Sequence, residues 1–223
     1  MIEFRNLSKV FVLRGQRKTV LDNVSLSFPT GRAVGLLGRN GAGKSTLLKM
    51  IAGTMDPTRG EIISTGTISW PVGFAGSFHG DLTGAQNARF IARIYGVDSD
   101  EMVDFVAGFA GLGAHFDLPF RSYSSGMKSR LAFGVSMAVP FDTYLVDEVT
   151  SVGDMAFRRK SAEVFAARMR HAGAVVVSHG MDQIRAMCDA AAVLENGHLQ
   201  YYDDVEEAIA QHNQNMQTPR FQT

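Results

Sequence analysis

The first 30 residues alternate polar and apolar positions, and many of the apolar ones are β-branched or aromatic. A basic stretch that contains a glycine, residues 14–18, divides this segment into two halves. Alternation with a period of two is typical of half-buried strands, and glycine between two such runs favours a turn. The segment is therefore predicted to form a small antiparallel sheet.

Farther along the chain, short continuous apolar runs are separated by segments with helical spacing. Short apolar runs of this kind are typical of strands buried on both faces, and their alternation with helices is the rhythm of a parallel sheet. We therefore expect an α/β core. The buried strands are expected at residues 33–37, 144–146 and 175–177, a further short strand near 61–64, and the helices over 45–52 and 155–171.

Between residues 83 and 137 the apolar positions recur every three or four residues instead of every second one. This spacing indicates helices, expected over residues 87–95, 99–109 and 127–137. Because strands of the core are expected before and after this segment, it is predicted to be a helical insert.

The last part of the chain begins with a turn signal, Asn196-Gly197. A short strand is expected after it, and then a helix from Val205 to about residue 212. The remainder, residues 213–223, is polar and is expected to be a tail without fixed structure.

Composition narrows the classes of partner. The 22 basic and 22 acidic residues cancel, so no long-range field favours DNA, RNA or an anionic lipid surface, and nucleic acid is not expected as a partner. No apolar stretch approaches the 18 or so residues that would cross a bilayer, and the N-terminus lacks a signal sequence. The only cysteine, Cys188, has no internal partner for a disulfide and is expected to be a small buried hydrophobe on a helix. The chain is expected to be soluble in a reducing cytosol.

The strongest chemical signal is the glycine-rich loop at residues 38–45, which follows the pattern G-x-x-x-x-G-K-S between a strand and a helix. Its glycines let successive backbone N–H groups point at one anion. Lys44 is expected to reach the β- and γ-phosphates of a nucleoside triphosphate, and Ser45 to ligate Mg²⁺. The residues expected to contact the nucleotide here are Gly38, Asn40, Gly41, Ala42, Gly43, Lys44, Ser45 and Thr46.

Two carboxylates follow the predicted strand at residues 144–146. Asp147 suits the acidic residue that holds Mg²⁺ through water, and Glu148 is placed to polarise the attacking water as a general base. Alone, an acidic pair after a strand is more often the start of a loop or a helix cap. The phosphate loop upstream favours the functional interpretation.

The order of the motifs adds a resemblance. Tyr123-Ser124-Ser125-Gly126-Met127 precedes the carboxylate strand, and Ser151-Val152-Gly153-Asp154 and His179 follow it. In this order the chain resembles an ABC transporter nucleotide-binding subunit. The resemblance implies a P-loop NTPase (RecA-like) α/β core with an N-terminal antiparallel β subdomain and an inserted α-helical subdomain at about 83–137. It also implies a single domain over residues 1–212.

The resemblance further implies roles for five residues. Ser124 and Gly126 would complete the ATP site of a second subunit in a homodimer, although Ser124 could equally be a plain helix N-cap. Asp154 would belong to the segment that crosses the dimer interface. His179 would be the switch histidine that contacts the γ-phosphate, although a solitary histidine is usually an ordinary residue. Phe11 would stack on adenine, or be a core aromatic of its strand.

One feature of the family is missing. The family normally has a glutamine near the metal after the strand that follows Gly66, and residues 70–79 contain none. Gly73, Phe74 or His79 could occupy the equivalent loop, in which case water would supply the sixth metal contact.

The altered signature, the Trp-Pro-Val-Gly-Phe loop and the run Val-Asp-Glu-Val-Thr-Ser-Val-Gly-Asp are most similar to the exporters of bacterial surface polysaccharides. Capsular-polysaccharide exporters are preferred over O-antigen and teichoic-acid exporters, because the tail after residue 212 leaves no room for the sugar-binding domain that some of those carry. The alternatives are a soluble ABC ATPase that acts on ribosomes or DNA, and a nucleotide-dependent scaffold with negligible turnover.

The resemblance to capsular-polysaccharide exporters implies ATP and Mg²⁺ as ligands and an ATPase at the cytoplasmic face of the bacterial inner membrane. The implied partners are a second copy of the chain, an integral membrane permease subunit that docks at roughly residues 70–95, and periplasmic and outer-membrane polysaccharide export proteins.

Overall fold

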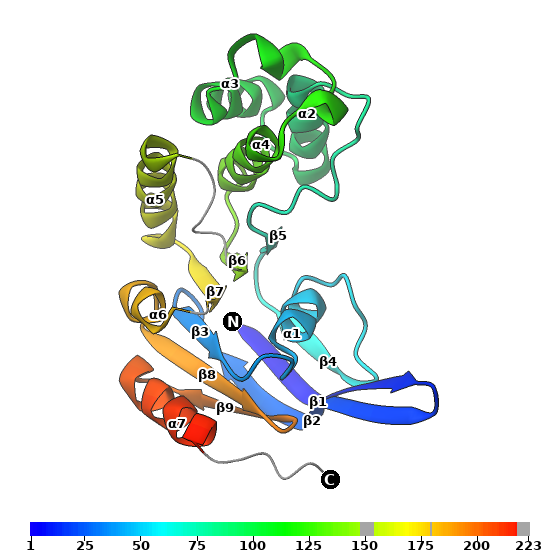
Figure 1. Cartoon of the computed structure of the whole chain (residues 1–223), viewed down its shortest axis with the longest axis vertical. Coiled ribbons are helices and arrows are strands. Elements are labelled where there is room, and N and C mark those ends of the chain that lie inside the picture. The colour runs from blue at the N-terminus through cyan, green and yellow to red at the C-terminus, as the bar shows by residue number, and fades with distance from the viewer. Residues whose placement is uncertain (148–153, 179, 218–223) are drawn as a thin grey trace. The chain divides into compact units, whose positions relative to one another are not determined.

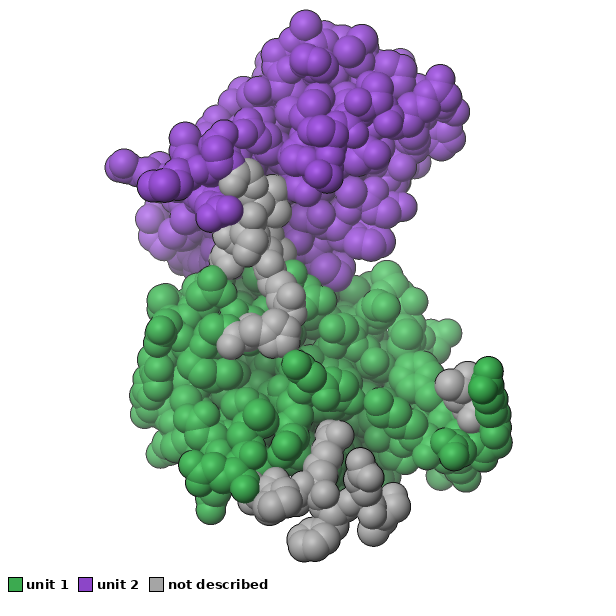
Figure 2. Space-filling view, viewed as in Figure 1, with its two compact units in different colours: residues 1–68, 142–148, 171–223 green, residues 69–141, 149–170 purple. Residues whose placement is uncertain are grey.

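The computed structural model describes residues 1–147, 154–178 and 180–217, and its contacts divide the chain into two compact units (Figure 2). Unit 1 comprises residues 1–68, 142–148 and 171–223. Unit 2 comprises residues 69–141 and 149–170 and contains the helices that the sequence predicts as an insert.

Unit 1 begins with a three-stranded antiparallel sheet in the order β2-β1-β4 (Figure 1). Its strands are β1 (Ile2–Leu13), β2 (Gln16–Phe28) and β4 (Arg59–Ser64). Arg14 and Gly15 form the turn between β1 and β2 with φ of 50° and 80°, the conformation of a two-residue hairpin turn. The antiparallel sheet is thus confirmed, although the turn is shorter than the basic stretch 14–18, because residues 16–18 already pair with β1.

The larger sheet of unit 1 contains the order β6-β7-β3-β8-β9, in which the first four strands are parallel and the last is antiparallel. The strands expected from apolar runs are confirmed as β3, β6 and β7. Strand β8 was not expected, because its three alanines are poor strand formers and only its buried central position makes them fit. The bounds are β3 (Ala33–Leu37), β6 (Thr143–Asp147), β7 (Gly173–Val177), β8 (Ala190–Glu195) and β9 (His198–Tyr202).

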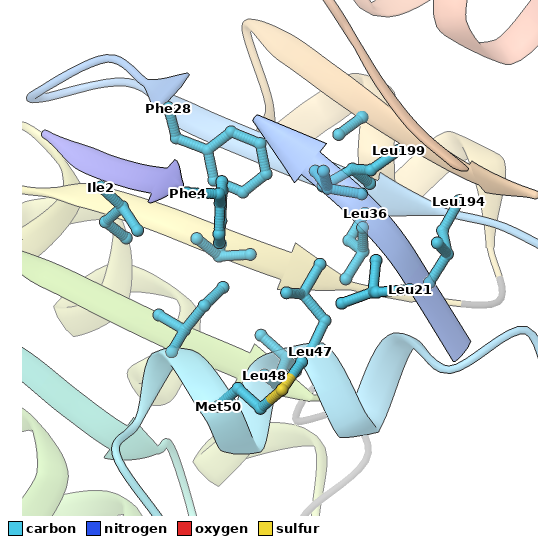
Figure 3. Packing of buried hydrophobic residues seen from close by; sticks show 14 of the residues in the cluster. Ile2, Phe4, Leu21, Phe28, Leu36, Leu47, Leu48, Met50, Leu194 and Leu199 are labelled. Carbon is cyan, nitrogen blue, oxygen red and sulfur yellow. The ribbon is translucent and has the colours of Figure 1, made fainter. Parts of the chain in front are cut away.

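Both faces of β3 are covered, which is why its sequence shows no alternation. On one face, Leu36 packs with Leu47 of α1 (Lys44–Ile51) in a core that also takes in the antiparallel sheet (Figure 3). On the other face, Gly35 leaves room for α6 (Met181–Met187), because a Cβ atom there would lie 2.9 Å from Cγ2 of Ile184. The core between α1 and the two sheets fixes the helix that follows the phosphate loop.

Unit 2 is built on four helices: α2 (Gly84–Tyr95), α3 (Ser99–Ala110), α4 (Ser125–Ala138) and α5 (Met155–Met169). All four were expected, and β5 (Ile68–Pro71) leads into the unit. Helix α2 begins three residues before the expected start. The reason is a capping box, in which the hydroxyl of Thr83 accepts from the N–H of Gln86 and the Gln86 side chain accepts from the N–H of Thr83.

Helix α7 (Val205–Gln217) extends farther than the sequence predicted. It continues five residues past residue 212, so the prediction of a structureless tail is wrong for residues 213–217, while residues 218–223 lie outside the described part. Two contacts hold the last turn. Gln211 donates to the side chain of Asn215 at 2.9 Å, and Arg39 of the phosphate loop donates to the Asn215 carbonyl at 3.1 Å.

Within the described ranges, no helix is both long and apolar enough to pass through a bilayer.

Cys188 is buried as expected, but it is the residue that ends α6 and does not lie inside a helix. Burial, with a smaller contribution from the charge of Asp189, raises the pKa of its thiol to about 12. Because only the thiolate is nucleophilic, we predict that iodoacetamide modifies native protein at pH 8 about a thousandfold more slowly than a thiol of ordinary pKa. Mass spectrometry of native and urea-unfolded samples tests this, and fast labelling of the native protein would contradict the buried position.

Candidate functional site

The glycine-rich loop connects β3 to α1, and its lysine is folded back onto the loop. The Lys44 side chain is buried, and its ammonium group donates to the carbonyls of Gly38 at 2.5 Å and Arg39 at 3.2 Å. The N–H of Ala42 donates to the Arg39 carbonyl at 3.0 Å, which closes the curl. The loop therefore holds its cation against two of its own carbonyl groups.

Two glycines are required here by close packing. Gly43 has φ of 115°, and a Cβ atom there would collide with the side chain of Val20 on β2. Gly38 has φ of 152°, and a Cβ atom there would lie 2.5 Å from the carbonyl oxygen of Leu194. Gly43 is also the N-cap of α1 and provides no side chain to cap it. The first N–H groups of α1 are thus available to an anion at the positive end of the helix.

A cavity of about 320 Å³ opens in front of this loop, which is within the size range of small-molecule sites. Its walls come from the hairpin β1–β2, the loop, the first turn of α1 and the end of β7. The lining residues are Phe11, Lys18, Val20, Asn40, Gly41, Gly43, Lys44, Ser45, Thr46 and Val177.

Phe11 lies at the hairpin end of this cavity. The side chain is 37% exposed, so the alternative that it is a core aromatic is wrong. The ammonium group of Lys9 lies 5.1 Å from the ring centroid and donates to the carbonyl of Asp56 at 2.6 Å. The ring is thus a supported apolar surface within the wall of the cavity, as expected for a residue that stacks on a planar base.

Asp147 ends β6 and pairs in register with Val177, which lines the cavity. Asp147 therefore lies at the same edge of the parallel sheet as the phosphate loop, one strand beyond β7, the neighbour of β3. The hydroxyl of Ser45 and the carboxylate of Asp147 are hard oxygen ligands, the kind that Mg²⁺ prefers. The described ranges contain no cluster of three His, Cys, Asp or Glu side chains that could hold a metal alone. These donors fit a magnesium ion that Ser45 would ligate directly and Asp147 through water, with phosphates supplying further ligands.

Glu148 and His179, the expected general base and switch histidine, lie outside the described residues. Each is the neighbour of a described strand end, since β6 ends at Asp147 and Ser178 follows β7. Their assignments stay predictions from the sequence.

A second cavity, of about 550 Å³, lies beside the same loop against α6 and α7. Its lining includes Arg39 and Lys44 of the loop and His212 of α7. His212 is 6% exposed, and its Nδ1 atom has no hydrogen-bond partner among the described residues. Burial lowers the pKa of His212, as do the charges of Lys44 and Arg39, while Glu195 opposes them. The sequence analysis did not predict the burial of His212 beside the phosphate loop, because residue 212 was expected to end the ordered chain.

The remaining expected site residues lie in unit 2. The hydroxyl of Ser124 accepts from the N–H of Met127 at 3.3 Å, so the plain N-cap role of Ser124 on α4 is observed. Gly126 has no described neighbour within 4 Å of the place where a Cβ atom would stand. Its lack of a side chain is therefore not explained by packing within the described residues, and it leaves the start of α4 open.

Asp154 is the N-cap of α5, and its carboxylate accepts from the N–H of Phe157 at 2.9 Å. It also forms an ion pair with Arg130 of α4 at 2.7 Å, and the Arg130 guanidinium lies 4.9 Å from the Phe157 ring centroid. The Phe157 N–H and, secondarily, Arg130 lower the pKa of Asp154. This carboxylate connects the start of α5 to the helix that begins at the signature.

The segment that lacks the family's glutamine is held by two buried side chains: Ser136, whose hydroxyl accepts from the Trp70 indole and from the N–H of Gly73, and Asn87. The Asn87 amide accepts from the N–H of His79 at 2.9 Å and donates to the His79 carbonyl at 3.1 Å. The Nδ1 atom of His79 accepts from the N–H of Asp81 at 3.3 Å. Of the three candidate replacements, Phe74 is exposed and His79 is tied down in this way. Which of them is the functional equivalent stays a prediction.

Sequence comparison gives a consistent assignment. The sequence model of the family described as ABC transporter matches residues 21–151. The chain is 46% identical to the polysialic acid transport ATP-binding protein KpsT of Escherichia coli, over 94% of this chain and 95% of that protein. It is 45% identical to the capsule polysaccharide export ATP-binding protein CtrD of Neisseria meningitidis serogroup B, over 96% and 99%. The O-antigen export system ATP-binding protein RfbB of Klebsiella pneumoniae is 35% identical, over 92% and 85%.

Structural comparison confirms the fold class. An ATP-binding cassette solved as a dimer in a post-hydrolysis state, with ADP and phosphate bound, superposes with a TM-score of 0.75. The match covers 90% of this chain and 98% of that one at 20% sequence identity. At this identity the structural similarity supports the fold alone.

The buried position of His212 generates a prediction about pH. Because its pKa is lowered in the folded state, the unfolded chain binds more protons below the ordinary histidine pKa of about 6.5. This residue therefore makes the free energy of unfolding fall as the pH drops from about 7 to 5. We predict that His212→Gln flattens that dependence in urea titrations, with His198→Gln, at an exposed histidine, as the control. An unchanged pH dependence in His212→Gln would contradict the burial of the imidazole beside Lys44 and Arg39.

Proposed function

The chain belongs to the ABC transporter family, whose cassettes bind and hydrolyse ATP, and on that premise we propose that it powers the export of a capsular polysaccharide across the bacterial inner membrane. The observation that carries the ATP site is the cavity with Phe11 at one end and the phosphate loop at the other. An aromatic surface and a nest of backbone N–H groups are what a nucleoside triphosphate needs at its two ends.

The choice of capsule over other surface polysaccharides rests on the relatives. Identity to the two proteins named for polysialic acid and capsule export is ten percentage points or more above that to the protein named for O-antigen export. Both alignments also span nearly the full length of those two relatives. An O-antigen or teichoic-acid exporter is the runner-up.

The described side chains support a division of labour on ATP. Adenine stacks on Phe11, and the β- and γ-phosphates draw the Lys44 ammonium away from the Gly38 and Arg39 carbonyls. Ser45 would hold Mg²⁺ directly and Asp147 through water, and the ion would neutralise phosphate charge during transfer. The loop itself moves little, because Gly43 is wedged against Val20.

The chemical step is assigned to the two residues at the strand ends. Glu148 accepts a proton from the attacking water and aligns it with the γ-phosphate. His179 donates a hydrogen bond to the γ-phosphate and reports its presence. Both roles come from the resemblance and from the positions of β6 and β7.

Two copies of the chain share two ATP molecules in this proposal. Each chain has a helix N-terminus suited to phosphate at α4 besides the one at α1, and the α1 terminus is the one that lines the cavity with Phe11. The Ser124 hydroxyl and the open backbone at Gly126 would meet the γ-phosphate held by the partner copy. Asp154 would lie at the same interface, held by Arg130.

The membrane permease is proposed to dock on α2. Phe90 and Ile94 are 51% and 57% exposed and lie four residues apart, so they share one face of the helix. Adjacent exposed apolar side chains mark interaction sites more often than scattered ones do. Docking would hold the subunit at the cytoplasmic face of the inner membrane, from which periplasmic and outer-membrane export proteins carry the polymer onward.

The first test concerns hydrolysis. In Glu148→Gln, the steady-state ATPase rate should fall at least about 10²-fold, because the amide cannot accept the proton, while ATP affinity is kept and ATP-bound dimers accumulate. The readouts are phosphate release, nucleotide binding and light scattering after size exclusion. Glu163→Gln, at an exposed carboxylate of α5, is the matched control. Undiminished hydrolysis in Glu148→Gln would refute the assignment.

The second test concerns the membrane partner. The double substitution Phe90→Ser and Ile94→Ser should weaken co-sedimentation with membranes that contain the permease by about tenfold or more, because two apolar anchors are lost. ATP binding by the purified variant should be unchanged, and Leu118→Ser, at another exposed apolar residue of unit 2, is the control. Full membrane recovery of the double variant would exclude α2 as the docking site.

A further inference from the structure

We propose that Lys18 is a second cation of the nucleotide site and contacts the α-phosphate, an assignment that rests on the placement of ATP proposed above. The sequence analysis placed Lys18 only in the basic stretch of a predicted turn and gave it no chemical role. On sequence alone it is one of several basic residues around a hairpin turn.

The hairpin brings Lys18 into the site. In the register of the sheet Lys18 is the direct partner of Phe11, and both line the nucleotide cavity. Directly opposite residues of an antiparallel pair have their side chains on the same face. A residue that stacks on the base therefore has a lysine beside it.

A bulge in β2 then aims the strand at the phosphate loop. Lys9 faces Leu21 and Val10 faces Thr19, so Val20 is the extra residue between these pairs. Bulges redirect side chains and are frequent next to active sites. Val20 fills the space over Gly43, and the Lys18 ammonium lies 4.0 Å from the place where a Cβ atom would stand on Gly41.

The charges of the cavity favour a polyanion at this position. Its described lining contains two ammonium groups, those of Lys18 and Lys44, and no carboxylate. The described ranges also contain no ion pair or hydrogen bond to the Lys18 side chain, so a phosphate would not have to displace an existing partner. The two cations lie at different parts of the loop, since Lys44 is folded onto Gly38 and Arg39.

The order of contacts along the cavity assigns the phosphate. The base lies at Phe11, and the β- and γ-phosphates lie at Gly43, Lys44 and Ser45. Lys18, next to Phe11 and against Gly41, falls between these two ends, where the ribose joins the α-phosphate. A contact to the α-phosphate contributes equally to ATP and ADP binding, whereas Lys44 discriminates in favour of ATP.

The test uses the full chain and compares Lys18→Met, Lys18→Arg, Lys44→Ala and Arg17→Met. Arg17→Met is the matched control, because it removes the same charge from an adjacent exposed residue that does not line the cavity. At low ionic strength we expect Lys18→Met to weaken ATP and ADP binding by about fivefold each, and adenosine binding not at all. Lys18→Arg should stay near wild type, and the effect of Lys18→Met should shrink in high salt.

The outcomes are distinguishable by isothermal titration calorimetry, with thermal melting to check the fold of each variant. If wild type binds ATP, Lys44→Ala does not, and Lys18→Met binds as wild type, then Lys18 is an ordinary surface residue and the inference is overturned. A loss of adenosine binding in Lys18→Met, or an equal loss in Arg17→Met, would also overturn it. If wild type binds no nucleotide, the proposed function falls together with the inference.

Discussion

The close approach of β2 to the phosphate loop is the constraint on which the site depends. Val20 occupies the space that any side chain at residue 43 would need, and the positive φ of Gly43 allows the loop to turn beneath it. Both partners of this contact continue directly into the core, at Leu21 on the strand and Leu47 on the helix (Figure 3). The antiparallel sheet, the loop and α1 are therefore one packed body that forms the walls of the cavity.

The phosphate loop also contacts α7. The Arg39 guanidinium reaches the Asn215 carbonyl, and His212 is buried near the ammonium group of Lys44. A buried imidazole beside two cations is destabilising when it carries a proton, so this packing favours the neutral ring. The loop is thus held from two directions by elements that are about 200 positions apart in sequence. A polar C-terminal helix becomes part of the support of the nucleotide site.

Much of the fold and of the candidate site could be predicted from the sequence, and the features that were missed have physical reasons. The alternation of residues 1–30, the apolar runs of the parallel strands and the loop 38–45 follow from local periodicity and spacing. The alanine-rich strand β8 has little strand preference of its own, and its burial comes from long-range packing. The support from His212 and the position of Lys18 depend on which strands and helices become neighbours. Periodicity does not contain that information, and the exposure of Phe11 is likewise a tertiary result.

The hairpin turn at Arg14 and Gly15 has an evolutionary consequence. In the proposed placement of ATP, the residues beside the base and ribose belong to a two-stranded arm, whereas those beside the terminal phosphates belong to the loop and the ends of the parallel strands. In that placement, substitutions along the arm would alter how tightly the nucleoside is held without changing the residues at the γ-phosphate. Nucleoside affinity and turnover would then be able to diverge separately among related cassettes.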